Sequence, residues 1–196
     1  FHRCLELYPD YELAYTGRGA ARREIGTPAR AVPDLTLALR LDPTNQWSYY
    51  ERYLAYRALE RWPEAFRDLE AAHLRNPKFV WEDRSENFRA ALAALKRAVR
   101  KHPQEPLGYL WLGDLRMRLG DFSQADLFLS RAIARAPSLA RAWILRGRAR
   151  GELGRWKAAF ADFNRAVRLD SDSPLPCAWR GRARQLRGDL AGAVRD

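Results

Sequence analysis

The residues best suited to catalysis or metal binding are few and scattered in this chain of 196 residues. Its three histidines stand at positions 2, 73 and 102, and Cys4 and Cys177 form no metal-binding spacing with them or with each other. The glycines lack the spacing of a phosphate-binding loop, and carboxylates such as Asp162 and Asp189 suit surface or helix-capping positions. We therefore predict no enzyme activity, no metal site and no cofactor. The two cysteines are interpreted as small apolar residues, typical of a reducing compartment such as the cytoplasm.

Arginine is the residue type that could carry a different chemistry, the recognition of anions. Lys and Arg outnumber Asp and Glu by 35 to 24, which gives a formal net charge of +11. Such a charge favours an acidic partner, which could be a protein, a nucleic acid or a membrane surface. The alternative is that the arginines only solvate the outer faces of helices, because acidic residues are interspersed among them. No apolar run is long enough to predict a membrane span.

The elements that hold these side chains repeat with a period of 34 residues. Two sets of glycines show this spacing, one within helices and one in turns: Gly113, Gly147 and Gly181, and Gly120, Gly154 and Gly188. A period of this length predicts stacked helical hairpins, each made of two short helices joined by a turn. Small residues let the helices approach closely, and we expect Gly147 to face Ala159.

The chain resembles a tetratricopeptide repeat (TPR) protein at the residues of this pattern. In the unit 106–139 these residues are Tyr109, Leu112, Gly113, Ala125, Leu129, Ala132 and Pro137. In the next unit they are Trp143, Gly147, Ala159, Phe163 and Ala166. The resemblance implies an all-α solenoid of helical hairpins that forms a right-handed superhelix. It also implies that the first helix of each pair lines a concave groove.

The phase of the pattern divides the chain into N-terminal repeats over 1–79, an irregular unit over 80–105 and C-terminal repeats over 106–196. The first region holds a partial unit, 1–11, and full units 12–45 and 46–79; the last holds units 106–139 and 140–173 and a partial unit, 174–196. The irregular unit has a truncated or absent first helix, and Asn87 is the candidate N-cap of its second helix. We expect residues 80–87 to be an extended crossover. A tight reversal, or residues missing from the sequence at this point, are the alternatives.

Four residues of the first two full units lead to local predictions. Thr27 is a candidate N-cap before Pro28, and Pro33 should delay or kink the helix that follows. Tyr53 replaces the small Gly of its unit, so it should push the helices apart or swing outward. Glu60 replaces the turn Gly of the same unit.

The TPR resemblance also indicates which residues line the groove. The carried-over positions that we take as the ligand-binding site are Arg23, Trp47, Tyr50, Arg57, Leu110, Asp114, Arg141, Ile144, Arg148 and Arg182. Aromatic side chains mixed with Arg suit an acidic peptide with apolar anchors, because a guanidinium pairs bidentately with a carboxylate. The alternative is that the aromatics belong to the core and the Arg only solvate the groove. TPR grooves that grip a C-terminal carboxylate use Lys and Asn at set positions, and this chain has neither there.

The sequence therefore predicts a protein–protein interaction scaffold that binds a partner segment in its groove. A regulatory TPR domain of a larger enzyme and a basic surface that binds nucleic acid are the alternatives. Uneven spacing of the aromatics and scarce Lys disfavour nucleic acid. The chain starts and stops within second helices, so we expect a fragment whose Phe1, Leu5, Leu190 and Val194 lack cover. End-to-end self-association through these terminal repeats is a further expectation.

Overall fold

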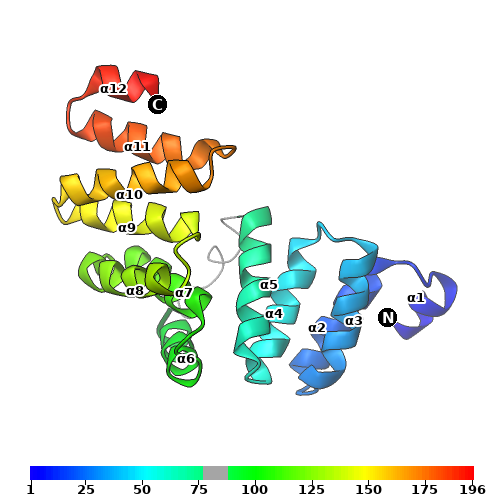
Figure 1. Cartoon of the computed structure of the whole chain (residues 1–196). Coiled ribbons are helices and arrows are strands. Elements are labelled where there is room, and N and C mark those ends of the chain that lie inside the picture. The colour runs from blue at the N-terminus through cyan, green and yellow to red at the C-terminus, as the bar shows by residue number, and fades with distance from the viewer. Residues whose placement is uncertain (77–87) are drawn as a thin grey trace. The chain divides into compact units, whose positions relative to one another are not determined.

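The computed structural model describes residues 1–76 and 88–196, and within these ranges it contains twelve α-helices and no strand (Figure 1). The helices form two compact units, Phe1–Asn87 and Phe88–Asp196. The predictions for residues 80–87, including the extended crossover and the cap at Asn87, lie outside the described residues.

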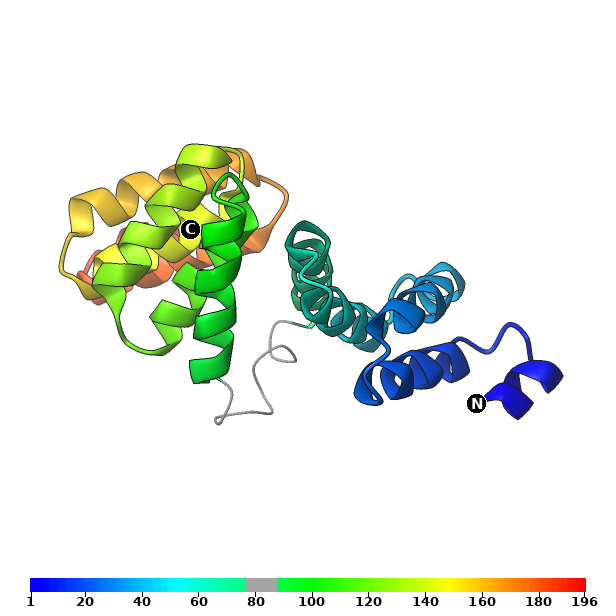
Figure 2. The same cartoon turned by 90° about the horizontal axis from the view of Figure 1, so that it is seen from below.

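The first unit consists of α1 (His2–Leu7), α2 (Glu12–Glu24), α3 (Pro28–Leu41), α4 (Gln46–Ala58) and α5 (Trp62–Arg75). Helices α2 and α3 form one hairpin and α4 and α5 the next, and α3 also packs against α4 (Figure 2). Fully buried Ala31, Leu35 and Ala55 pack together where these hairpins meet. Small and branched apolar residues at repeat positions thus join one hairpin to the next.

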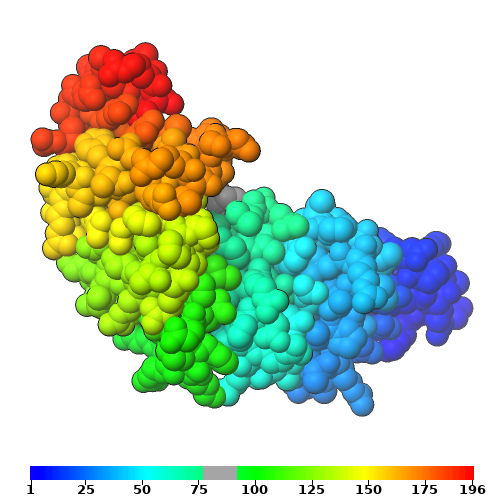
Figure 3. Space-filling model, in the orientation of Figure 1, coloured from blue at the N-terminus to red at the C-terminus, as the bar shows by residue number. Residues whose placement is uncertain are grey.

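The second unit begins with α6 (Phe88–Lys101) and continues with hairpins that form successive bands of the surface in Figure 3. The hairpins are α7 (Pro106–Arg118) with α8 (Phe122–Arg135), α9 (Ala140–Glu152) with α10 (Trp156–Leu169), and α11 (Pro174–Leu186) with α12 (Leu190–Arg195). Their core includes Leu110, Leu129 and Leu145, and a second cluster forms around Phe163. Each hairpin therefore buries its apolar side against its neighbours.

First helices of consecutive hairpins contact one another directly within each unit. The contacts join α2 to α4, α7 to α9, and α9 to α11. The second helices α3, α8 and α10 each pack against the first helix of their own hairpin and that of the next. One face of each unit is therefore lined by first helices, as the TPR resemblance implies.

Several local predictions are corrected by the structure. Helix α3 begins at Pro28 and continues through Pro33, so the predicted late start is wrong. Thr27 is the N-cap residue of α3, as predicted, but its hydroxyl donates to the carbonyl of Arg22 at 2.8 Å and makes no capping hydrogen bond. Tyr53 does not swing outward, because it is only 8% exposed.

The apolar residues near the two ends of the chain differ in solvent exposure. Phe1, Leu190 and Val194 are 61%, 63% and 88% exposed, as expected, whereas Leu5 is half-buried.

The close approach at Gly147 involves a large side chain of α10. A Cβ atom on Gly147 would lie 2.8 Å from Cε1 of Phe163. The same geometry recurs at Gly19 and Gly113, where the Cβ would lie 2.6 Å from Cγ of Leu35 and Leu129 respectively. In each unit, the large side chain 16 residues later occupies the space that the glycine leaves.

Replacing Gly147 by Leu should therefore overpack the contact with Phe163 and destabilise the fold by about 1 to 3 kcal/mol. Ala161→Leu is the matched control, because it enlarges an exposed residue of the same hairpin. Thermal unfolding of the two variants measures the difference. An unchanged melting temperature for Gly147→Leu would contradict the packing described here.

All five described turns between the helices of a hairpin contain one residue in the left-handed region. Gly26, Gly120, Gly154 and Gly188 have φ of 81°, 73°, 73° and 78°, and Glu60 has φ of 57°. The glycines have nothing within 4 Å of a built Cβ, so conformation alone favours glycine there. Glu60 makes the same turn with a conformation that costs an L-residue about 1 to 2 kcal/mol.

We expect Gly154→Ala to destabilise the chain by roughly 1 kcal/mol, because alanine must adopt the left-handed conformation. Glu60→Ala should change stability far less, since the natural residue already has a side chain at the equivalent position. Denaturant unfolding of both variants tests this comparison. Equal losses would show that φ does not determine the effect.

Candidate interaction surface on the first helices

The predicted groove residues of the second unit lie on one face made by α7, α9 and α11. Positions seven or eleven residues apart on a helix share a face, and Arg141, Arg148 and Glu152 on α9 have this spacing. Asp114 on α7 and Arg182 on α11 each lie 34 residues from Arg148, at the same repeat position. Since these three helices pack side by side, their equivalent positions form one row.

Asp114 is the buried carboxylate of this row, at 5% exposure. Nη2 of Arg141 lies 3.1 Å from Oδ2 of Asp114, and Nε of Arg118 lies 3.8 Å from the same oxygen. The Arg141 guanidinium also lies 4.4 Å from the centroid of the Trp111 ring. Arg141 is therefore held by partners within the chain.

Arg148 has a different environment. Its guanidinium carbon lies 4.0 Å from the centroid of the Trp179 ring, and that of Arg182 lies 5.9 Å from the same centroid. Burial lowers the pKa of the Arg148 guanidinium from its ordinary value, and Arg182 acts in the same direction. Across the described residues, no carboxylate lies within ion-pair distance of Arg148. A half-buried cation thus rests on an indole ring with no acidic partner from the described chain.

Two predicted groove residues, Leu110 and Ile144, are buried. Leu110 is 0% exposed and Ile144 is 4% exposed. They share a face with the row but lie beneath its surface, where Leu110 belongs to the core cluster around Leu129. In this structure they support the row and do not line it.

The first unit presents an aromatic face on α2 and α4. Trp47 is 44% exposed, and its ring centroid lies 6.4 Å from that of Tyr50. The guanidinium of Arg57 lies 5.6 Å from the Tyr53 centroid. Nε of Arg23 donates to the buried carboxylate of Glu51 at 2.8 Å. Trp47 therefore offers apolar surface, while Arg23 is already paired.

The described ranges hold neither a membrane-spanning helix nor a cluster of metal-binding side chains. None of the helices there is long and apolar enough to cross a membrane. Within the same ranges, no three His, Cys, Asp or Glu side chains are grouped so that they could hold a metal ion. Cys4 and Cys177 are free thiols.

Comparisons with known proteins place these repeats in a family. Two family models, both described as tetratricopeptide repeat, match residues 84–149 and 140–173. Residues 84–173 belong to the tetratricopeptide repeat family. No curated protein sequence matches it. Membership supports a protein–protein interaction scaffold as the general class of function.

Solved TPR-type structures share the fold at low sequence identity. PilW, a widely conserved type IV pilus biogenesis factor, is 17% identical with a TM-score of 0.55, over 94% of this chain and 89% of that one. The APC/C hetero-tetramer Cut9–Hcn1 is 12% identical with a TM-score of 0.56, over 99% of this chain and 40% of that one. YrrB, a TPR protein with an unusual peptide-binding site, is 19% identical with a TM-score of 0.47, over 90% and 95% of the two chains. The likenesses to PilW and Cut9–Hcn1, together with the family matches, show an all-α TPR solenoid.

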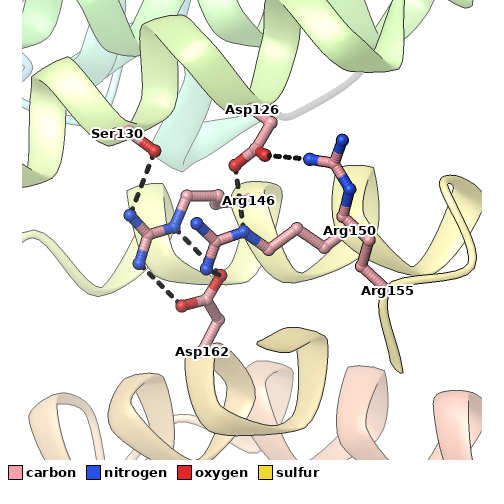
Figure 4. A network of polar contacts seen from close by, with 6 residues as sticks. All are labelled: Asp126, Ser130, Arg146, Arg150, Arg155 and Asp162. Atoms are coloured by element: carbon pink, nitrogen blue, oxygen red, sulfur yellow. Dashed lines mark hydrogen bonds and ion pairs between the residues drawn. The ribbon is translucent and has the colours of Figure 1, made fainter. Parts of the chain in front are cut away.

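The TPR hairpins contain a polar network that sequence reasoning missed (Figure 4). Asp162 is 2% exposed, so its interpretation as a surface or cap residue is wrong. It accepts hydrogen bonds from Nε and Nη2 of Arg146 at 3.0 and 2.7 Å, and from Nη1 of Arg150 at 2.9 Å. Nη1 of Arg146 also donates to Ser130 of the preceding hairpin at 3.1 Å. Asp189, in contrast, caps α12 as predicted.

This Arg–Asp pair recurs along the TPR array with a separation of 16 residues. The other pairs are Arg18 with Asp34, Arg52 with Asp68, and Arg180 with Asp196. In three of the four pairs the Arg directly precedes the repeat Gly. The unit 106–139 has no such pair, because Leu112 stands at the Arg position. The signal was present in the sequence as paired 34- and 16-residue spacings of Arg and Asp. These arginines are structural, and they lie on the side of the first helices opposite to the row of Arg148.

Proposed function

We propose that this TPR chain is an interaction scaffold that binds an acidic segment of a partner protein along α7, α9 and α11. The observation that carries the proposal is Arg148, stacked on Trp179 with no acidic partner among the described residues. A half-buried cation with no carboxylate in ion-pair contact costs free energy, and a partner carboxylate would offset that cost.

The row is also organised before binding. Stacking on Trp179 restricts the Arg148 side chain, so less rotamer entropy is lost when a carboxylate binds. Hydrogen bonds to charged groups contribute about 1.5 to 3 kcal/mol each. Arg182 on the neighbouring helix supplies a second guanidinium at the same ring. Two arginines on adjacent helices suit a segment with more than one acidic residue.

The aromatic face of the first unit is proposed to hold an apolar anchor of the same or another segment. Trp47 and Tyr50 are the residues assigned to this role, because Trp47 is large and exposed and the two rings are neighbours. Aromatic side chains of this kind are frequent energetic anchors of interfaces.

Trp47→Ala should weaken partner binding by about tenfold, or about 1.4 kcal/mol. The loss comes from apolar contact, so the salt dependence of binding should stay unchanged. Leu74→Ala is the control, because it removes an exposed apolar side chain from a second helix. Calorimetric titration at two salt concentrations measures both quantities. Equal effects of the two variants would remove Trp47 from the site.

Selection of random twelve-residue peptides on the immobilised chain tests the proposal. We expect enriched sequences to combine Asp or Glu with Leu, Phe or Trp. The selected peptides should lose binding to a chain carrying Arg148→Glu and retain it with Arg168→Glu, which reverses an exposed charge on α10. Enrichment of basic peptides, or binding indifferent to Arg148, would contradict the proposal.

A further inference from the structure

Two guanidinium groups lie against one indole ring on this face. The guanidinium carbons of Arg148 and Arg182 lie 4.0 and 5.9 Å from the centroid of the Trp179 ring. Asp114, the buried carboxylate of the row, is already bound by Arg141. Among the described residues, neither Arg148 nor Arg182 has a carboxylate within ion-pair distance.

We propose that Arg148 and Arg182, above the ring of Trp179, bind a phosphorylated side chain of the partner segment. This inference rests on the proposed function and specifies the anion that the segment carries. The carrying observation is the placement of two guanidinium groups from α9 and α11 against one indole ring.

The charge and shape of a phosphate monoester fit this placement better than a single carboxylate does. A phosphorylated side chain carries a charge of about −1.5 to −2 at neutral pH and three acceptor oxygens. It can therefore accept hydrogen bonds from two guanidinium groups together, whereas one carboxylate bound bidentately by one Arg leaves the other unpaired. The guanidinium carbons of Arg148 and Arg182 lie 4.0 and 5.9 Å from the same ring centroid.

The platform beneath this pair is fixed by the core. Trp179 packs against the buried cluster of Ala159, Phe163 and Ala183. A ring held in this way keeps Arg148 at the surface of α9, while the exposed Arg182 is free to adjust to the ligand. Glu152 is exposed and close enough to Arg148 to interact with it electrostatically.

Titration of the isotope-labelled chain with phenyl phosphate and with benzoate tests the inference by NMR. Both probes carry one aromatic ring, but phenyl phosphate has about twice the negative charge above its second pKa. The signals to follow are the indole N–H of Trp179 and the Nε–H of Arg148, assigned with the variants Trp179→Phe and Arg148→Lys. We expect saturable shifts of both signals and at least tenfold tighter binding of phenyl phosphate. Arg148→Gln should remove this difference, whereas Arg168→Gln should preserve it.

A peptide comparison separates this inference from the proposed function. A selected acidic peptide is prepared with phosphoserine, Glu or Ser at one position, and the phosphoserine form should bind at least tenfold more tightly than the Glu form. Equal binding of the phosphoserine and Glu forms through Arg148 would overturn the phosphate inference and leave the proposed function intact. Failure of all three forms to bind would overturn both. Tighter binding of oligothymidylate than of the phosphopeptide, insensitive to Arg148→Gln, would also overturn the inference.

Discussion

Asp162→Leu should destabilise the chain by about 3 to 5 kcal/mol, the usual cost of removing one partner from a buried ion pair. The substitution leaves Arg146, whose side chain is only 12% exposed, without its carboxylate. Arg150 keeps Asp126 as a partner, with a distance of 2.9 Å, so most of the cost arises at Arg146. A loss of this size is a large part of the stability of a typical domain. Chemical denaturation followed by circular dichroism measures it.

Removing both members of the pair should cost much less than removing the carboxylate alone. The unit 106–139 shows that apolar residues fit these positions, because Leu112 and Phe128 occupy the places of Arg146 and Asp162. Leu112 is 1% exposed there. We therefore expect Arg146→Leu with Asp162→Leu to recover roughly 2 kcal/mol relative to Asp162→Leu. Strictly additive losses in the double-mutant cycle would show that the pair is not coupled.

Reversing Arg148 and Arg182 to Glu should weaken binding of an acidic partner segment by about thirtyfold, or about 2 kcal/mol. Each partly exposed pair contributes about 0.2 to 1 kcal/mol, and like-charge repulsion adds to the loss. Arg141 is kept in this variant, because reversing it would leave the buried Asp114 beside a second carboxylate. Fluorescence anisotropy with a labelled acidic peptide measures the affinity.

Arg131→Glu with Arg168→Glu is the matched control for this variant. It makes the same change in net charge at exposed positions on α8 and α10. A peptide bound on the first-helix face should bind this control nearly as well as the natural chain.

A nucleic acid would respond differently to both double variants. Its log affinity should fall steeply with log salt, because each phosphate contact releases counterions. Arginines of the second helices would then contribute as much as those of the row, so both variants should lose affinity equally. Equal losses would contradict a site confined to the first helices.

The fold could be predicted from the sequence because its determinants are local and periodic. A glycine with positive φ in four of the five described hairpin turns, and small residues at most positions where helices approach, repeat at 34 residues and identify the hairpins. The sequence could not show that the Phe163 side chain fills the space beside Gly147, because that depends on the rotation of α10 against α9. It also allowed a late start of the helix at Pro33, whereas α3 begins at Pro28 and includes that residue.

The candidate site could be predicted only in part. Arg141 and Arg148 look equivalent in sequence, and only packing shows that Asp114 binds the former and that Trp179 supports the latter. Leu110 and Ile144 share the helical face of the row, yet neighbouring helices cover them. The Arg–Asp pairs were missed because each side chain looks like a solvated charge until both are placed within one hairpin.

Site-specific photo-crosslinking tests the central proposal most directly. One photoreactive residue replaces Leu175, which is 52% exposed in the first turn of α11, and another replaces the exposed Arg168 on α10. The labelled acidic peptide selected on the natural chain is then irradiated with each protein at a concentration that saturates binding. We predict a crosslink from position 175 that unlabelled peptide competes away, and no competed crosslink from position 168. A competed crosslink from position 168 alone would contradict binding on the first-helix face.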